Sequence, residues 1–121
     1  MMDTDAPIYD ERVVAELRAA TGDDDAFILD LVATYLGEGE EQLATITAAA
    51  EAADAAAMVP AAHTLKSSSA ALGAMRLASV CRGLEDAARA GRTEGFATAG
   101  QRARDAWTDT IAAFRAGGLT T

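Results

Sequence analysis

The sequence predicts an all-α protein, an antiparallel four-helix bundle with a short additional N-terminal helix. Half of the 121 residues are apolar but only 5% are aromatic, and the abundance of alanine favours helices over strands. Apolar residues recur every three or four positions through most of the chain. The segments between these patterns are short, so consecutive helices should pack antiparallel. This length fits one domain, which we place at residues 9–118, after a flexible tail of residues 1–8.

The first two helices are predicted from their ends and their apolar spacing. The segment DERVVAELRAATG predicts a short helix with Asp10 as its N-cap and Gly22 as its stop, lying across one end of the bundle. Three consecutive aspartates then suit the N-terminus of a long second helix. Gly37 and Gly39 weaken the middle of that helix and favour a bend there. Its apolar positions are Phe27, Leu31, Tyr35, Leu43 and Ile46.

The remaining helices follow the same reasoning. The third should begin between Asp54 and Pro60, because proline fits best in a first turn. It then runs through AAHTLKSSSAALGA at residues 61–74. The fourth should end at Gly91, and the fifth should run from about Thr93 to the sequence AGG. We expect the lone cysteine, the tryptophan and the phenylalanines in the core, where these two helices contribute Leu77, Val80, Cys81, Leu84, Ala88, Phe96, Ala103, Trp107, Ile111 and Phe114.

Charge and composition disfavour several classes of function. The formal charge of −9 argues against binding to nucleic acid or to an anionic membrane, since both need clustered Lys and Arg. No apolar run approaches the roughly 20 residues that span a bilayer, and the N-terminus does not resemble a signal peptide. A single cysteine cannot form an internal disulfide. We therefore expect a cytoplasmic protein, and a monomer because like charges oppose self-association.

The one histidine, His63, and the one lysine, Lys66, lie one helical turn apart. On a helical wheel the large apolar residues of this segment lie roughly 160° to 240° from His63, so the imidazole should point outward. Lys66 and Ser67 lie about 60° and 40° to either side of it. An exposed imidazole with the ordinary histidine pKa of about 6.5 is a good nucleophile near neutral pH. The positions expected to face the core are Met58, Ala61, Leu65, Ser69 and Leu72.

Around His63 the residues are small or apolar. A lone histidine is most often a surface residue without a specific role, and a metal site would need further ligands that the sequence does not place beside it. A smooth surface would nevertheless let another protein approach the imidazole closely. We expect docking on the small or apolar positions Val59, Ala62, Ala70, Gly73 and Ala74.

Charged residues elsewhere give weaker indications. Arg76 and Arg82 are candidates for additional positive charge near the histidine. Glu85 is expected on a solvated surface, where it could contact Arg82 or Arg89 along its own helix.

The stretch at residues 61–74 resembles the signature of histidine-containing phosphotransfer (HPt) domains, in which His-x-Leu-Lys-Gly-Ser precedes small residues and Leu-Gly. LEDAAR at residues 84–89 fits the same family, and the resemblance covers roughly residues 9–116. The residues that match the signature are His63, Leu65, Lys66, Ser68, Leu72 and Gly73.

This resemblance implies a role in a phosphorelay. His63 would accept a phosphoryl group from an aspartate of one receiver domain and pass it to the aspartate of another, while Lys66 would stabilise the phosphoryl oxygens. The implied partners are response-regulator receiver domains and a hybrid sensor histidine kinase. No cofactor is expected on this chain, since the Mg²⁺ would be held by the receiver, and the protein would not be an enzyme in the strict sense.

One position departs from the family pattern. Ser67, next to Ser68, stands where the family usually has glycine, and we expect it to slow the transfer or make it selective for certain partners. The alternative function is a phosphorylation-independent module that binds a receiver or a kinase through a degenerate site. A hydrolase with His63 as general base would need a cleft and an orienting carboxylate. The phosphoacceptor domain of a chemotaxis-type kinase, or a piece of a larger hybrid kinase, is also compatible with the resemblance.

Overall fold

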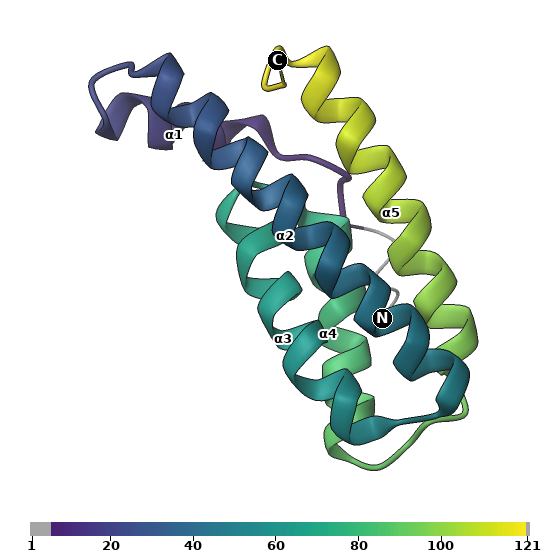
Figure 1. Cartoon of the computed structure of the whole chain (residues 1–121). Coiled ribbons are helices and arrows are strands. Elements are labelled where there is room, and N and C mark those ends of the chain that lie inside the picture. Colours follow the sequence, from purple (N-terminus) through teal and green to yellow (C-terminus); the bar gives the residue numbers. More distant parts are fainter. Residues whose placement is uncertain (1–5, 121) are drawn as a thin grey trace.

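Helices dominate the part of the chain that the computed structural model describes, residues 6–120, and no strand occurs there. The four longer helices, α2 to α5, form an antiparallel bundle in which each packs against its neighbour in sequence and α2 also packs against α5 (Figure 1). The short α1 lies at the end of the bundle where α2 begins. The predicted fold class is therefore confirmed. The helices span Glu11–Ala20 (α1), Asp25–Ala52 (α2), Ala55–Ala71 (α3), Met75–Arg89 (α4) and Phe96–Ala116 (α5).

Aspartates determine where the first three helices begin. The side chain of Asp10 accepts a hydrogen bond from the backbone N–H of Arg12 at the start of α1. Asp24 and Asp54 do the same for backbone N–H groups in the first turns of α2 and α3, each at 3.0 Å. These caps satisfy donors that a helix leaves unpaired and place a negative charge at the positive end of its dipole.

Two helices differ in detail from the prediction. Pro60 is the sixth residue of α3 and not part of its first turn. It is exposed, so the helical carbonyl that loses its partner there can bond to water. The α2 helix runs unbroken through both of its glycines, and Gly39 lies directly against the indole ring of Trp107 on α5. A Cβ at this position would clash with that ring, whereas a Cβ at Gly37 would meet nothing within 4 Å.

The segment before α1 is fixed against the start of α4. The carbonyls of Ala6 and Pro7 accept hydrogen bonds from the side chain and the backbone N–H of Arg76, each at 2.9 Å. These contacts join the end of the predicted tail to the bundle, while residues 1–5 of that tail lie outside the described part of the chain. The same contact engages the guanidinium of Arg76, which was a candidate for positive charge near the histidine.

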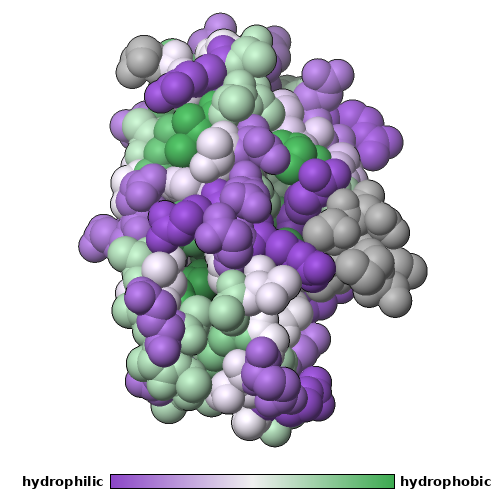
Figure 2. Space-filling view, turned by 90° about the vertical axis from the view of Figure 1, so that its right-hand side faces the viewer, coloured by the Kyte–Doolittle hydropathy of each residue, from purple (hydrophilic) through white to green (hydrophobic). Residues whose placement is uncertain are grey.

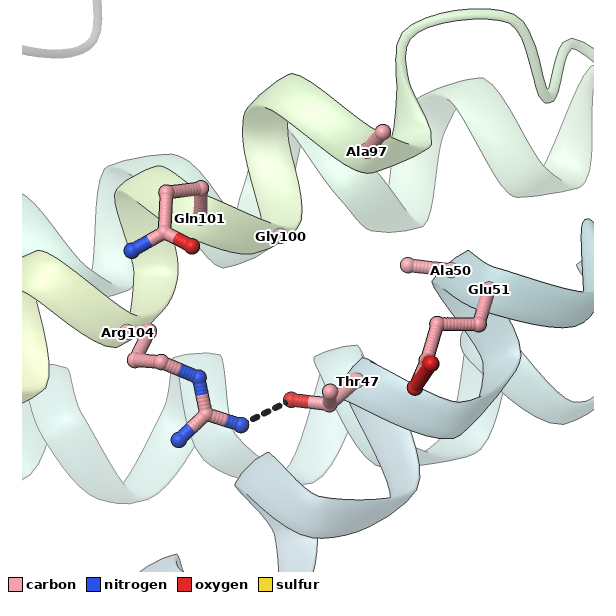
Figure 3. Close-up of a pocket in the computed structure, with 7 residues that line it drawn as sticks. All are labelled: Thr47, Ala50, Glu51, Ala97, Gly100, Gln101 and Arg104. Atoms are coloured by element: carbon pink, nitrogen blue, oxygen red, sulfur yellow. Dashed lines mark hydrogen bonds between the residues drawn. The ribbon is translucent and has the colours of Figure 1, made fainter.

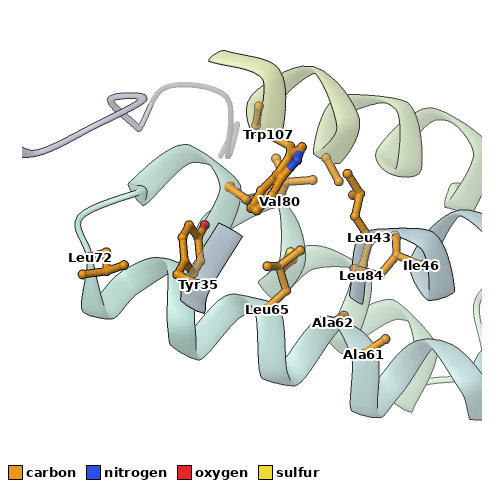
Figure 4. Close-up of a cluster of buried hydrophobic side chains, with 14 of the residues drawn as sticks. Tyr35, Leu43, Ile46, Ala61, Ala62, Leu65, Leu72, Val80, Leu84 and Trp107 are labelled. Carbon is orange, nitrogen blue, oxygen red and sulfur yellow. The ribbon is translucent and has the colours of Figure 1, made fainter. Parts of the chain in front are cut away.

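The core forms between the four long helices and contains few polar groups (Figure 4). The hydroxyls of Tyr35 on α2 and Ser69 on α3 share a hydrogen bond of 2.7 Å inside it, which satisfies both groups. Cys81 and Trp107 are buried as predicted. Phe27 is not, since its side chain is 44% exposed and its neighbour Ile28 takes the core position in the first turn of α2.

The two glycines of α2 provide a matched test of this packing. We expect Gly39→Ala to destabilise the protein by about 1 to 3 kcal/mol, because the new methyl group must displace Trp107. Gly37→Ala should stabilise it by up to about 1 kcal/mol, because alanine favours the helix and the site is open. Thermal unfolding of the two variants beside the parent checks this. Equal melting temperatures for the two variants would contradict the close approach of α2 and α5.

Candidate functional site

His63 lies near the middle of α3 and points away from the core. Its side chain is 55% exposed, and the ring is therefore open to a second protein. The orientation follows from the helical period, since the opposite side of α3 carries the large apolar groups. The prediction of which α3 residues face the core is confirmed, because all five are buried: Met58, Ala61, Leu65, Ser69 and Leu72.

A buried carboxylate on the neighbouring helix binds the imidazole. The side chain of Glu85, on α4, is only 5% exposed, and its Oε2 lies 2.9 Å from Nδ1 of His63. Its other oxygen, Oε1, accepts a hydrogen bond of 2.6 Å from the ammonium of Lys66. Arg89, one turn further along α4, donates from both Nε and Nη2 to Oε2 at 3.1 and 2.7 Å. Glu85 thus joins both candidate residues of α3 to a third residue that the sequence did not place at the site.

Both cations keep this carboxylate ionised. The hydrogen bond from Lys66 and then those from Arg89 lower the pKa of Glu85 to about 2, against the opposing effect of burial, with a smaller contribution from His63. A carboxylate can only accept hydrogen bonds. In the neutral ring, the hydrogen must therefore lie on Nδ1, so that Nε2 carries the lone pair.

The local charge differs in sign from that of the whole protein. Lys66 and Arg89 contribute two positive charges against the single negative charge of Glu85, so the group is net positive while His63 is neutral. The chain as a whole carries −9. An anionic group that approaches this cluster would therefore meet a favourable local field on an otherwise acidic chain.

The expectation that Glu85 lies on a solvated surface was wrong, although its contact with Arg89 was foreseen. Burial is tolerated here because each carboxylate oxygen has a charged donor. A sequence signal was available, since Leu77, Cys81 and Ala88 form a buried stripe on α4 and Glu85 occupies the position within it four residues after the cysteine. A carboxylate at a core position indicates a partner on the opposing helix.

Three of the five predicted docking positions are not on the surface. Ala62 is completely buried, because it lies about 100° from His63 on the wheel and faces a neighbouring helix. Ala74 is also completely buried, because α3 has ended before it and it caps α4. Gly73 is buried in the turn between α3 and α4, where its carbonyl accepts a hydrogen bond from the backbone N–H of Asp10. Only Ala70, which is exposed, and Val59, which is half-buried, remain available.

The three serines after Lys66 have different environments. Ser67 is exposed and makes no hydrogen bond to His63 within the described chain. The hydroxyl of Ser68 donates to the backbone carbonyls of Thr64 and Leu65, so it is occupied within its own helix. Ser69 is the buried partner of Tyr35. Ser67 is thus the serine placed to affect an approaching group.

Other surface features lie apart from this cluster. A hollow of about 310 Å³ between α2 and α5 is lined by residues of those two helices, with Arg104 donating a hydrogen bond to Thr47 (Figure 3). On the side of the molecule where α5 lies, a band of hydrophilic residues separates patches of apolar surface (Figure 2). Within residues 6–120, no group of three His, Cys, Asp or Glu side chains is arranged to hold a metal. None of the helices there has the length and apolarity needed to cross a membrane.

Fold and site together define a class of protein, an antiparallel four-helix bundle with one exposed histidine bound to a carboxylate beside a cation. A family model described as Hpt domain matches residues 30–117. The crystal structure of histidine-containing phosphotransfer protein B (HptB) from Pseudomonas aeruginosa PAO1 is similar, with a TM-score of 0.80 and 31% sequence identity over 93% of this chain and 95% of that chain. No curated protein matches the sequence. The chain belongs to the Hpt domain family, as the resemblance indicated.

The position of the imidazole hydrogen can be tested directly. Because the chain has one histidine, long-range proton–nitrogen NMR spectra of the ring are free of overlap. We expect hydrogen on Nδ1 and a bare Nε2 when the ring is neutral, because Glu85 accepts from Nδ1. In Glu85→Leu, which has no acceptor, the hydrogen should move largely to Nε2. A parent spectrum with the hydrogen mainly on Nε2 would contradict the geometry.

Glu85 should also contribute to stability in a defined pH range. Its pKa is depressed in the folded protein, so its contribution is complete above pH 4.5 and is lost as the pH falls toward about 2. Between pH 5 and pH 2 the parent should therefore lose about 2 kcal/mol more free energy of unfolding than Glu85→Gln does. Denaturant unfolding of both proteins across this range measures the difference. Parallel pH profiles would show that the carboxylate is not held by its cations.

Proposed function

We propose that this protein is a phosphorelay intermediate that accepts a phosphoryl group on Nε2 of His63 from a receiver-domain aspartate and passes it to the aspartate of another receiver. The observation that carries the proposal is the 2.9 Å contact between Nδ1 of His63 and the buried carboxylate of Glu85. This contact occupies one ring nitrogen and leaves the other, on an exposed side chain, with its lone pair available to a partner.

The chemical step follows from this tautomer. The Nε2 lone pair attacks the phosphorus in line, the new phosphorus–nitrogen bond forms, and the bond from phosphorus to the aspartate oxygen breaks. The leaving carboxylate keeps the electron pair. The ring retains its hydrogen on Nδ1 and becomes positively charged, and Glu85 stabilises that charge as it develops. Passing the phosphoryl group to a second aspartate reverses these events and returns a neutral ring.

Lys66 is proposed to stabilise the transferred group. Its side chain is 27% exposed and its ammonium already donates to Glu85, and an ammonium has three donors. A phosphoryl group on Nε2 could therefore be reached by a donor that points toward solvent. The Mg²⁺ that neutralises the phosphoryl group during transfer is assigned to the receiver domain.

Docking is proposed on the exposed side of α3. Ser67 and Ala70 are exposed and Val59 is half-buried, and all three lie on the same side of α3 as His63. A hollow of about 330 Å³ between α2 and α3, with Thr64 and Ser68 on its α3 side, continues this surface. The proposed partners are response-regulator receiver domains fed by a hybrid sensor histidine kinase.

The alternative of a phosphorylation-independent docking module is less well supported. Docking alone would not require a buried carboxylate that orients the ring and a lysine joined to the same group. The hydrolase alternative gains the orienting carboxylate that it needed. However, more than half of the His63 side chain is exposed on the surface of a helix, which does not exclude water from a bound substrate.

Phosphotransfer can be tested with a phosphorylated receiver domain. We expect a mass increase of one phosphoryl group on this protein, lost on brief acid treatment and absent from His63→Gln. The fold of the variant is checked by its melting temperature. Binding of several phosphorylated receivers without any label on the parent would support the docking module instead.

The role of Ser67 is measured in the same assay. Ser67→Gly should raise the transfer rate severalfold, because it removes a hydroxymethyl group beside His63 at the (i, i+4) position. The melting temperature should fall slightly, since glycine disfavours the helix. An unchanged rate with every receiver would show that Ser67 does not crowd the approach.

A further inference from the structure

Arg89 binds the carboxylate of Glu85 through two of its hydrogen-bond donors. Its Nε and Nη2 both donate to Oε2 of Glu85, the same oxygen that binds Nδ1 of His63. Lys66 is the only described side chain that donates to the other oxygen. The two carboxylate oxygens are therefore divided, with the lysine of α3 on one and the arginine of α4 on the other.

This division matters because Lys66 has two tasks in the proposed mechanism. It neutralises Glu85 in the resting protein, where the carboxylate is 5% exposed, and it stabilises a phosphoryl group after transfer. An ammonium that turns toward the phosphoryl group weakens its bond to the carboxylate. A buried carboxylate that loses its counter-charge is strongly disfavoured, so Glu85 would hold the lysine back unless another cation replaces it.

We propose that Arg89 is a positioning residue that keeps Glu85 neutralised, and thereby releases Lys66 to turn to a phosphoryl group on His63. This inference rests on the proposed function. Arg89 acts through Glu85, and its own contact with the transferred group is not required.

Side-chain geometry supports the division of tasks. Arg89 lies four residues after Glu85 on the same helix, and its planar guanidinium presents donors in a fixed arrangement. Lys66 reaches across from α3 on a flexible four-carbon stem that ends in a compact charge. The arginine is thus the cation that stays with the carboxylate, and the lysine is the one that can move.

Arg82, which the sequence offered as another contact for Glu85 and as a positive charge near His63, is exposed and forms no ion pair in the described chain. From α3, Glu85 meets His63 and Lys66, and from α4 it meets Arg89. The thiol of Cys81 also lies near it on α4, but burial and the Glu85 charge raise the pKa of that thiol to about 12, so it remains neutral. Within residues 6–120, no further cation forms an ion pair with Glu85.

A double-mutant cycle tests the proposal. The variants are Lys66→Gln, Arg89→Gln and the two combined, and phosphoramidate serves as a small phosphoryl donor that needs no receiver. We expect Lys66→Gln to slow labelling of His63 about tenfold in the parent but less than about twofold in the Arg89→Gln background, because Lys66 no longer leaves Glu85 there. Arg89→Gln alone should cost nearly as much as Lys66→Gln, and Arg89→Lys should restore most of the rate.

Arg82→Gln is the matched control. This arginine lies on the same helix, is exposed, and forms no ion pair within the described chain, so its substitution changes the net charge equally. Its labelling rate should equal that of the parent. Additive effects of Lys66→Gln and Arg89→Gln, or equal rates for Arg89→Gln and Arg82→Gln, would overturn the proposal.

A second readout needs no phosphorylation. Lys66 is the only lysine, so its acylation by an amine-reactive ester is measured by peptide mass. Reactivity should fall about fivefold in Arg89→Gln, where Glu85 binds the lysine more strongly, and stay unchanged in Arg82→Gln. This response in a protein that takes no label would refute the phosphorelay function while retaining the coupling. Normal labelling with no change in reactivity would refute only the role of Arg89.

Discussion

The buried carboxylate of Glu85 is the constraint on which the candidate site depends. It is 5% exposed and is bound by an imidazole, an ammonium and a guanidinium at once. Because burial of an unpaired carboxylate is costly, the folded structure places all three groups in contact with Glu85. The consequence for His63 is chemical as well as geometric, since an ionised acceptor at Nδ1 determines which ring nitrogen carries the lone pair. The contact with Glu85 thereby fixes the orientation and the tautomer of an exposed histidine.

This arrangement requires α3 and α4 to be held in one register. The helices are joined by a short turn that is fixed from outside, since the backbone of Asp10 donates to the carbonyl of Gly73 and a side chain at Gly73 would collide with the backbone of Asp10. A left-handed conformation at this glycine, with φ of +82°, completes the turn. Small residues on α3, such as Ala61 and Ala62, let the helices approach closely. Elements remote from the histidine thus determine how Glu85 meets it.

The sequence was sufficient for the fold and for the direction of His63, because both follow from apolar periodicity and from helix caps that are local. The sequence was insufficient to predict which groups contact the histidine. Glu85 looked solvated because acidic residues usually are, and only its partners on α3 and α4 make its burial possible. The prediction of the docking surface was wrong at Ala74 for a related reason. A helical wheel can be drawn past the residue at which the helix ends. The wheel therefore placed Ala74 beside His63, although α3 ends at Ala71. The exposure of Phe27 likewise depends on which neighbour takes the core position, and periodicity does not decide that.

The charge of the cluster also bears on how partners could be distinguished. A net-positive point on a chain of charge −9 attracts an anionic phosphoryl group over short distances, where fields are strongest and salt screens them least. At longer range the acidic surface repels an acidic partner and favours one with basic residues around its own active site. In the proposed function, recognition of the partner and stabilisation of the transferred group therefore involve different parts of the surface. On that proposal, a change of charge on the surface around the cluster would alter the rate of encounter, whereas a change among His63, Lys66, Glu85 and Arg89 would alter the chemical step.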